Sequence, residues 1–434
     1  MFARNKPDVL VVGAGPVGLF TALTLTKRGI PVRILDKDWR TGTRSYALAL
    51  HAESLRYFEE LGLLASVLEH ARRIRTIAMY DGAQRKAEMR ISGLSEDHSF
   101  LAVLPQESLE RILEEALAKQ KVKVSWSHEA VRLEPREKGM DVTIEKLSKD
   151  SVGYTVQHTE WVVSGTEHLT VPFVIGADGH FSNVRRAAGI EFPTVGNANE
   201  FAVFEFKTDA DLRDEMPLVL TGGTTNVCWP LADGACRWSF QKPLEDPDWD
   251  TREKDRDFVQ VGAGLFPSLN EERLRSLLSE RAPWFRGNVS GLRWRMMVRF
   301  ERRLAESFGK GRTWLVGDAG HLTGPAGIQS MNVGFREGRD LANAIAAALQ
   351  PGGSTEPLEQ YGKERLAEWR GLLGVEPMLR GDANTDPWVA EHKDQILPCI
   401  PASGRDLATL LGQIGLTCRL PAAFRTPAGK APTP

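Results

Sequence analysis

Short apolar runs and helical spacing alternate along the first part of the chain. Asp8 to Val12 reads DVLVV, a continuous apolar run typical of a buried strand. Pro16 to Lys27 has apolar residues at helical spacing, and Gly29 follows it as a residue that commonly ends helices. Pro31 to Leu35 repeats the strand pattern. The order strand, helix, strand predicts a parallel sheet with a right-handed crossover.

The texture changes between residues 201 and 241. Short alternating runs (FAVFEFK, LVL, VCWPL, CRWSFQ) are separated by turn signals such as Gly222-Gly223 and Asp233-Gly234. This pattern predicts an antiparallel sheet and a second domain. Elsewhere the patterning predicts helices at 52–68, 106–119, 271–280, 332–349 and 357–373, and strands at 122–126, 171–176, 292–300 and 313–316.

Composition excludes several classes of protein. The 434 residues carry 55 basic and 57 acidic side chains, a net charge of −2, which does not favour nucleic acid as a partner. No segment approaches the roughly 18 uninterrupted apolar residues of a membrane span. The N-terminal apolar run is too short for a signal peptide, and the four cysteines form no CxxC pair. We therefore expect a cytoplasmic protein with reduced thiols, no metal site and no membrane span; oligomeric state stays open between monomer and dimer.

A glycine-rich motif, Gly13-Ala14-Gly15-Pro16-Val17-Gly18, connects the first strand to the first helix. Gly13 permits a tight turn, Gly15 lets the backbone approach a pyrophosphate, and Gly18 lets the helix pack close to the strand. Asp36 ends the second strand, 18 residues after Gly18, where a carboxylate can bind ribose hydroxyls. Because a carboxylate disfavours a 2′-phosphate, this motif predicts bound FAD or NAD and not NADP.

Two further motifs follow predicted strands. One is GADGHFSNVR at 176–185, and the other is GDAGH at 317–321, which continues through Pro325 to Asn332. Each places a carboxylate at the carboxyl edge of a parallel sheet, where such sheets bind ligands. A helix begins near Asn332, so its free N–H groups and its dipole would point to the same edge and stabilise an anionic ring.

In this ordered set of motifs the sequence resembles the class A flavoprotein monooxygenases, the para-hydroxybenzoate hydroxylase-like family. That family has a GxGxxG site, a GADGxxSxVR motif and a GDAxH motif, and the resemblance covers roughly residues 8–350. It implies an α/β fold: a Rossmann-like FAD-binding domain of the para-hydroxybenzoate hydroxylase type, with an inserted, mostly antiparallel β-sheet substrate domain and C-terminal helices. The expected division is 1–80, 100–190 and 290–350 for the FAD-binding domain, 81–99 and 191–289 for the substrate domain, 351–420 for a C-terminal helical segment, and 421–434 for a disordered tail.

The resemblance also implies roles for single residues. The glycine motif would hold the pyrophosphate, Asp36 the adenosine ribose and Asp318 the ribityl chain, while Asp178 would serve both FAD and the nicotinamide cofactor. Met331 and Asn332 would offer their backbone to the pyrimidine edge of the flavin. The full expected FAD-binding set is Gly13, Gly15, Pro16, Val17, Gly18, Asp36, Lys37, Arg44, Gln106, Asp178, Gly317, Asp318, Pro325, Gly327, Met331 and Asn332.

The function that the resemblance implies is an FAD-dependent monooxygenase, a hydroxylase or epoxidase. NADH or NADPH would reduce the flavin transiently, O₂ would add at its C4a carbon, and the hydroperoxide would oxygenate an aromatic or polyketide-like small molecule. Alternatives on the same fold are a flavin-dependent oxidoreductase, a halogenase, whose WxWxIP motif residues 229–231 do not match, and a non-redox flavoprotein with structural FAD. No acid or base residue is assigned.

Some positions depart from the family or have two readings. The family commonly has Gly-Gln-Gly where this chain has Ile328-Gln329-Ser330, and Tyr46 stands where a small residue is common. His321 is expected to be a structural part of its turn. Four tryptophans either line a substrate pocket or belong to the core of a sheet: Trp229, Trp238, Trp284 and Trp294.

Overall fold

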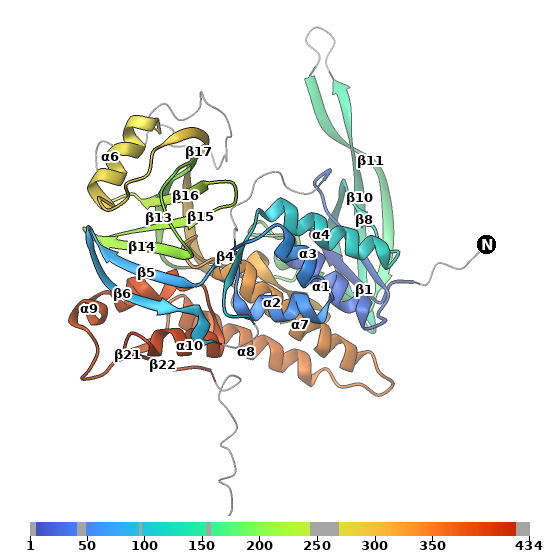
Figure 1. Cartoon of the computed structure of the whole chain (residues 1–434). Coiled ribbons are helices and arrows are strands. Elements are labelled where there is room, and N and C mark those ends of the chain that lie inside the picture. Colours follow the sequence, from blue (N-terminus) through green and yellow to red (C-terminus); the bar gives the residue numbers. More distant parts are fainter. Residues whose placement is uncertain (1–5, 41–48, 95–97, 153–157, 244–268, 422–434) are drawn as a thin grey trace, which may run out of the picture.

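The computed structural model describes residues 6–40, 49–94, 98–152, 158–243 and 269–421 (Figure 1). Arg44 and Tyr46 lie outside the described residues, and so does the predicted tail from residue 422 onward.

A six-stranded sheet forms the predicted dinucleotide-binding domain. β1 pairs in parallel with β2 on one side and with β12 on the other, so the predicted strand, helix, strand unit is present. All four residues of β1 are buried, as its apolar run predicted. The strand order is β18-β19-β12-β1-β2-β8. The bounds are β1 Val9–Val12, β2 Val32–Leu35, β8 Val124–Ser125, β12 Phe173–Gly176, β18 Gly309–Lys310 and β19 Thr313–Leu315.

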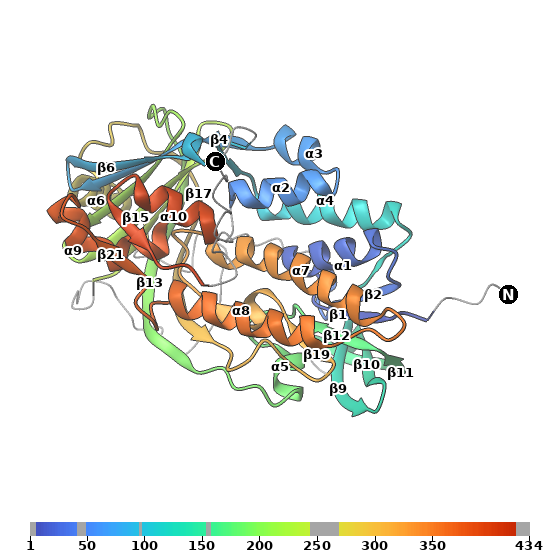
Figure 2. The same ribbon diagram turned by 90° about the horizontal axis from the view of Figure 1, so that it is seen from below.

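Helix α1 (Pro16–Lys27) packs on this sheet, and α4 (Gln106–Lys119) and α7 (Gln329–Ala348) pack against α1. α1 and α7 lie side by side (Figure 2). Aromatic rings join them, because the ring centroid of Phe20 on α1 lies 5.0 Å from that of Phe335 on α7. Phe20 also lies 5.6 Å from Phe58, which belongs to the neighbouring segment 52–60. Each aromatic pair adds about 0.5–1.5 kcal/mol beyond its buried area.

The single helix predicted for 52–68 is wrong. The structure has α2 (Ala52–Glu60) and α3 (Leu64–Glu69), separated at Gly62, whose φ of 72° cannot continue a helix. A small sheet beside them contains β3 (Ala49–Leu50), β7 (Leu101–Val103) and β4 (Arg72–Ile74).

The second large sheet has eight strands in the order β20-β17-β13-β16-β15-β14-β5-β6, and α6 (Glu271–Arg281) covers part of one face (Figure 1). It is antiparallel as predicted, except that β14 and β5 run parallel. Strand pairing places residues 76–81 and 290–304 in this sheet. The sheet domain therefore favours boundaries before residue 76 and after residue 304, whereas the sequence predicted them at 81 and 290. The bounds are β5 Thr76–Asp81, β6 Gln84–Arg90, β13 Thr194–Lys207, β14 Glu215–Thr221, β15 Thr224–Pro230, β16 Ala235–Gln241, β17 Ser290–Leu304 and β20 His321–Leu322.

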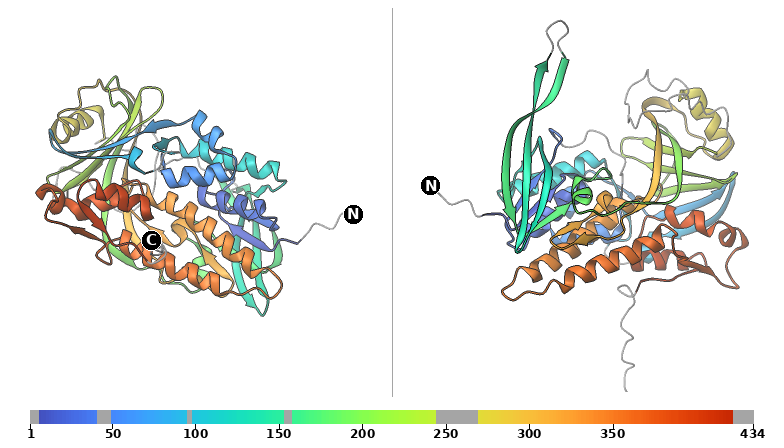
Figure 3. Two further views of the ribbon diagram at one scale, coloured as in Figure 1. Left: turned by 60° about the horizontal axis from the view of Figure 1, so that its bottom comes forward. Right: turned by 180° about the vertical axis from the view of Figure 1, so that it is seen from behind.

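A long three-stranded sheet of β9 (His128–Arg136), β10 (Gly139–Val152) and β11 (His158–Val171) projects from the body (Figures 1 and 3). The ion pair between Arg33 on β2 and Glu167 on β11 ties its base to the six-stranded sheet.

The C-terminal segment packs on both domains. It contains α8 (Glu356–Leu372), α9 (Pro387–Ile396) and α10 (Gly404–Gly412), and a two-stranded sheet of β21 (Leu379–Gly381) and β22 (Leu416–Cys418). Among the described residues, none of the helices combines the length and apolar character that a membrane crossing requires.

Candidate functional site

The three sequence motifs meet at one edge of the six-stranded sheet. β19, β12 and β1 are adjacent and parallel, so the turns that follow them lie next to one another. Ala177 N–H donates to the Val12 carbonyl at 2.7 Å, and Val316 N–H donates to the Gly176 carbonyl at 3.0 Å. The predicted convergence of segments that are far apart in the sequence is therefore present.

The glycine turn leaves open space where the first helix begins. A Cβ on Gly13 would lie 2.2 Å from the Ala177 carbonyl oxygen, and a Cβ on Gly18 would lie 2.0 Å from the Gly13 carbonyl oxygen, so both positions require glycine for packing. A Cβ on Gly15 would meet nothing within 4 Å. Gly15 is the N-cap of α1, with no side-chain cap and no acidic residue in the first turn. The free N–H groups and the helix dipole thus face open space that suits a phosphate.

Asp36 connects the glycine turn to β2. Its carboxylate accepts a hydrogen bond from Ala14 N–H at 2.6 Å and one from Asp38 N–H at 2.8 Å. Burial raises the pKa of Asp36, and these two bonds oppose the rise. Lys37 is exposed beside it. The carboxylate lies at the predicted ribose position, and its role towards a ribose stays a prediction.

Asp178 shapes the turn after β12. It accepts hydrogen bonds from Ser182 Oγ at 2.5 Å and from Val184 N–H at 3.1 Å, and so fixes the start of α5 (Asn183–Ala187). Burial raises its pKa, and the bond from Ser182 opposes the rise most strongly. The carboxylate is thus already engaged within its own turn, and any contact with FAD or a nicotinamide cofactor stays a prediction.

Arg185 joins the second motif to the third. Its guanidinium donates to the Ala319 carbonyl at 2.8 Å and to the His180 carbonyl at 2.8 Å. It also lies 3.9 Å from the centroid of the Phe192 ring, in cation–π geometry. This side chain therefore fixes the distance between the two loops that carry Asp178 and Asp318.

The third motif rests on a buried carboxylate. Gly317 has a φ of 62° and opens the short helix η2 (Gly317–Ala319), and its N–H donates to Glu337 Oε2 at 2.7 Å. Glu337 is fully buried on α7 and also accepts from Trp369 Nε1 at 2.7 Å. Burial alone would raise its pKa, but contact with His321 and the donated bonds outweigh burial, so its pKa is lowered. Asp318 is exposed at the edge of the sheet.

His321 is fully buried and holds a structural position, as expected. Its ring stacks on Trp369 with centroids 3.7 Å apart, and its Nε2 lies 3.1 Å from Glu337 Oε2. Its Nδ1 faces Ser330 Oγ at 3.3 Å.

Asn332 anchors the start of α7 through its side chain. Its Oδ1 accepts from His51 N–H at 2.8 Å and from Ser54 Oγ at 2.7 Å, while its Nδ2 donates to the carbonyls of Ala49 and Ile328. The Asn332 side chain is thus fully engaged within the protein, and the backbone contact of Met331 and Asn332 with a flavin stays a prediction. α7 begins without a side-chain cap and without an acidic residue in its first turn.

The loop before α7 is held by the C-terminal segment. Gly327 N–H donates to the Pro398 carbonyl at 3.1 Å, and a Cβ on Gly327 would lie 2.7 Å from that oxygen. Gln329 Nε2 donates to the carbonyls of Leu397 and Ile400, both at 3.2 Å. Residue 327 must therefore be glycine to pack against η3 (Leu397–Cys399), whatever its contact with a cofactor. Pro325 is half-buried in the same loop.

Ile328 occupies a position where the resembled family has glycine. Its φ of 48° and ψ of 37° are left-handed, which is costly for a β-branched residue. The side chain is buried, so it keeps apolar contacts that oppose this strain.

Gln106 begins α4, directly after the small sheet that contains β3 and β7. Its Nε2 donates to Glu110 Oε1 at 2.8 Å, and the side chain is half-buried. Its role at the ribityl chain stays a prediction.

Comparison with known proteins supports a flavoprotein. A family model described as "FAD binding domain" matches residues 6–373. The chain belongs to the FAD binding domain family. The membership that the three motifs predicted is therefore confirmed, and FAD is the cofactor of this family.

Among relatives of the FAD binding domain family, 6-methylpretetramide 4-monooxygenase of Streptomyces rimosus is 29% identical over 85% of this chain and 61% of that protein. The chain therefore spans less than two thirds of that relative's length. The crystal structure of p-nitrophenol 4-monooxygenase from Pseudomonas putida DLL-E4 has a TM-score of 0.68 at 21% identity, covering 94% of this chain and 96% of that one. The Diels-Alderase PyrE3 of pyrroindomycin biosynthesis has a TM-score of 0.65 at 20% identity over 94% of this chain and 80% of that one. The shared fold alone therefore does not decide the activity.

The geometry fits the cofactor of the FAD binding domain family. Two helices, α1 and α7, direct uncapped N-termini to the edge of the sheet that carries the motifs. The open space at Gly15 is a second feature that fits, because a side chain there would obstruct a pyrophosphate. Asp36 and Asp318 lie at this edge with carboxylates that could accept from hydroxyl groups of the cofactor.

Sequence reasoning missed Glu337, Arg336 and Arg185. Glu337 shares a face of the predicted helix with Gly334, Leu341 and Ile345, which lie three residues before it and four and eight residues after it. A charged residue on an otherwise apolar face was the signal that could have identified it. Arg185 belongs to the GADGxxSxVR motif, but nothing in the sequence showed that it reaches the loop after β19.

Arg336 lies in a buried ionic network between helices. It pairs with Glu53 on α2 at 2.7 Å and with Glu368 on α8, which also pairs with Arg365 at 3.1 Å. Burial alone would raise the pKa of Glu53, but Arg336 outweighs burial and lowers it. The network links α7 to two neighbouring helices, α2 and α8.

Three of the four candidate tryptophans belong to the protein core. Trp229 and Trp238 are buried, and Trp284 stacks on Tyr80 with centroids 4.5 Å apart. Trp294 lies half-buried on the face of the large sheet that α6 does not cover, and Arg237 stacks over its ring. It is therefore the only one of the four that fits a substrate wall.

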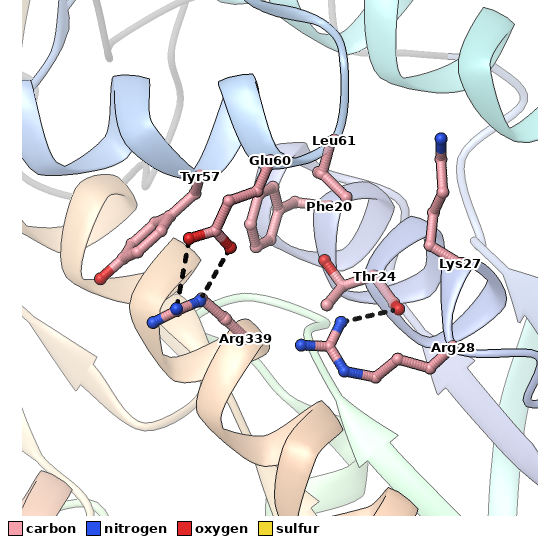
Figure 4. Close-up of a pocket in the computed structure, with 8 residues that line it drawn as sticks. All are labelled: Phe20, Thr24, Lys27, Arg28, Tyr57, Glu60, Leu61 and Arg339. Carbon is pink, nitrogen blue, oxygen red and sulfur yellow. Dashed lines mark hydrogen bonds and ion pairs between the residues drawn. The ribbon is translucent and has the colours of Figure 1, made fainter. Parts of the chain in front are cut away.

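A cavity of about 230 Å³ lies between α1, α2 and α7, away from the motifs (Figure 4). The cavity lies beside the C-terminal end of α1, where the Arg28 side chain donates to the Thr24 carbonyl at 3.1 Å. Arg339 and Glu60, which also line the cavity, form an ion pair. None of the predicted cofactor residues lines it. The candidate FAD site is therefore defined by the motifs and not by this cavity.

Proposed function

We propose that the protein is an FAD-dependent monooxygenase that uses NADH or NADPH and O₂ to hydroxylate a phenolic or polyketide-like aromatic molecule. The observation that carries the proposal is the convergence of two uncapped helix N-termini and three motif turns at one sheet edge. Similarity to 6-methylpretetramide 4-monooxygenase and p-nitrophenol 4-monooxygenase supports an aromatic substrate. The free cysteines support the cytoplasm as its location.

When bound, FAD would supply the redox chemistry that connects the nicotinamide cofactor to O₂. The chain's own residues bind and orient. The N–H groups at the start of α1 and the glycine turn hold the pyrophosphate, and Asp36 accepts from ribose hydroxyls. At the start of α7, the free N–H groups and the positive end of the dipole would stabilise negative charge on a bound flavin.

The large sheet supplies the substrate wall in this proposal. β20 follows the third motif directly and pairs with β17, so the sheet begins at the cofactor edge. The face opposite α6 carries buried Phe201, Val203 and Met296 with half-buried Trp294 and Phe300. An apolar wall beside the ring would hold an aromatic substrate and exclude water from the reactive centre.

The test uses purified protein loaded with FAD. We expect a yellow holoprotein whose NADH or NADPH oxidation accelerates with the correct phenol, with matching O₂ consumption and a product heavier by one oxygen atom. Unloaded apoprotein is the control. Protein that binds no FAD would refute the proposal, and so would NAD(P)H oxidation that never yields an oxygenated product with any phenol or polyketide tested. Flavin that no NAD(P)H bleaches would favour structural FAD instead.

A further inference from the structure

Ser330 stands at a position where the resembled family commonly has glycine. It is the second residue of α7, at the N-terminus that faces the candidate cofactor site. A hydroxyl at this place is a feature of this chain.

The Ser330 hydroxyl bonds to side chains of the third motif and not to the helix. Its Oγ donates to Asp318 Oδ1 in a short hydrogen bond, and His321 Nδ1 lies 3.3 Å from the same oxygen. A serine can cap a helix by accepting from a backbone N–H, but the described residues include no side-chain cap for α7. Helix capping therefore does not explain Ser330.

A chain of contacts connects Asp318 to the core. A serine hydroxyl has one hydrogen, which goes to the Asp318 carboxylate, an acceptor only. Behind Ser330, His321 Nε2 contacts Glu337 Oε2 at 3.1 Å, and both of these residues are fully buried. The exposed carboxylate is thus bonded to a half-buried serine that contacts a fully buried pair of side chains. Within the described residues its second oxygen, Oδ2, has no hydrogen-bond partner.

We propose that Ser330 is a positioning residue that holds Asp318 in the orientation that FAD requires, fixing one carboxylate oxygen and leaving the other for the cofactor. The inference rests on the proposed function only through FAD binding. An exposed aspartate without this support would have to be ordered when FAD binds, which costs affinity. Removing the hydroxyl should therefore raise the Kd for FAD by about 3- to 10-fold, the cost of ordering one side chain.

The experiment measures the Kd for FAD by flavin fluorescence on apoprotein, without any turnover. We expect Ser330→Ala to raise Kd by about 3- to 10-fold, and Ser330→Thr, which keeps the hydroxyl, to restore it to near the wild-type value. Ser276→Ala, on the exposed face of α6, is the matched control and should leave Kd unchanged. Melting of each apoprotein checks that the variants are folded.

A double-mutant cycle with Asp318→Ala, which removes the acceptor of the Ser330 hydroxyl, tests whether Ser330 acts through Asp318. If it does, Ser330→Ala should add no further loss in the Asp318→Ala background. An unchanged or tighter Kd for Ser330→Ala would overturn the inference, as would an equal loss in both backgrounds. Either result leaves the proposed monooxygenase intact, whereas a wild-type protein that binds no FAD overturns both.

Discussion

Replacing Glu337 with glutamine should destabilise the protein strongly, although it only exchanges one carboxylate oxygen for an NH₂ group. Glu337 accepts from Gly317 N–H and Trp369 Nε1, each at 2.7 Å, and contacts His321 at 3.1 Å, all without water access. A glutamine amide must point its NH₂ at one of these donors. The protein would lose hydrogen bonds to a charged acceptor, and one buried donor would be left without an acceptor. Together these losses should lower the free energy of unfolding by about 3–5 kcal/mol.

Urea unfolding of the wild type and of Glu337→Gln at several pH values measures this cost. The pKa of Glu337 is lowered in the folded protein from an unfolded value of 4.5. A lowered pKa gives stability that is present above 4.5 and is lost as the pH falls through the folded value. The gap between the two proteins should therefore be full at pH 7 and shrink in acid. Glu391→Gln, on the exposed face of α9, is the control. A gap below about 1 kcal/mol, small beside a total stability of 5–15 kcal/mol, would refute the reasoning, and so would a gap that does not change with pH.

Four further substitutions test other parts of the site and its support. Gly15→Ala should leave the free energy of unfolding in urea nearly unchanged, because its Cβ meets open space. It should weaken FAD binding at least about tenfold, because the new methyl group would obstruct the pyrophosphate. Gly18→Ala, whose Cβ would lie 2.0 Å from a backbone oxygen, should instead lower the free energy of unfolding by at least about 1–3 kcal/mol. Arg336→Met should cost about 3–5 kcal/mol in urea unfolding, because Glu53 and the buried Glu368 each lose the ion pair with Arg336. Ile328→Gly should relieve about 1–2 kcal/mol of strain from the left-handed backbone conformation. It should also lose about 2–5 kcal/mol of apolar packing, so we expect a net decrease in stability in urea unfolding. A more stable variant would show that the strain outweighs the packing.

Local sequence signals predicted the cofactor edge well. The glycine turn, its strand and α1 follow from spacing alone, and α1 has the predicted bounds. The convergence of Gly13, Asp178 and Gly317 could be predicted because parallel strands deliver their ends to one edge. The roles of these residues towards FAD stay predictions.

Long-range contacts could not be predicted. Arg185 reaches Ala319, which is 134 residues away, and Gly327 packs against Pro398. The local sequence of either segment does not indicate which distant residue it contacts. The division of 52–68 into two helices depends on the left-handed backbone conformation of Gly62. Apolar positions continue at helical spacing on both sides of this glycine, so the pattern predicted one helix.

The dependence of residues 327–329 on the carbonyls of 397–400 has a consequence for biosynthesis. These carbonyls emerge from the ribosome some 68 residues after the loop that they support. The nascent dinucleotide-binding domain can form its six-stranded sheet earlier, but the turn entering α7 stays without its support until then. Stable flavin loading is therefore expected to await translation past Ile400, which makes incorporation of the prosthetic group a late event in the maturation of this polypeptide.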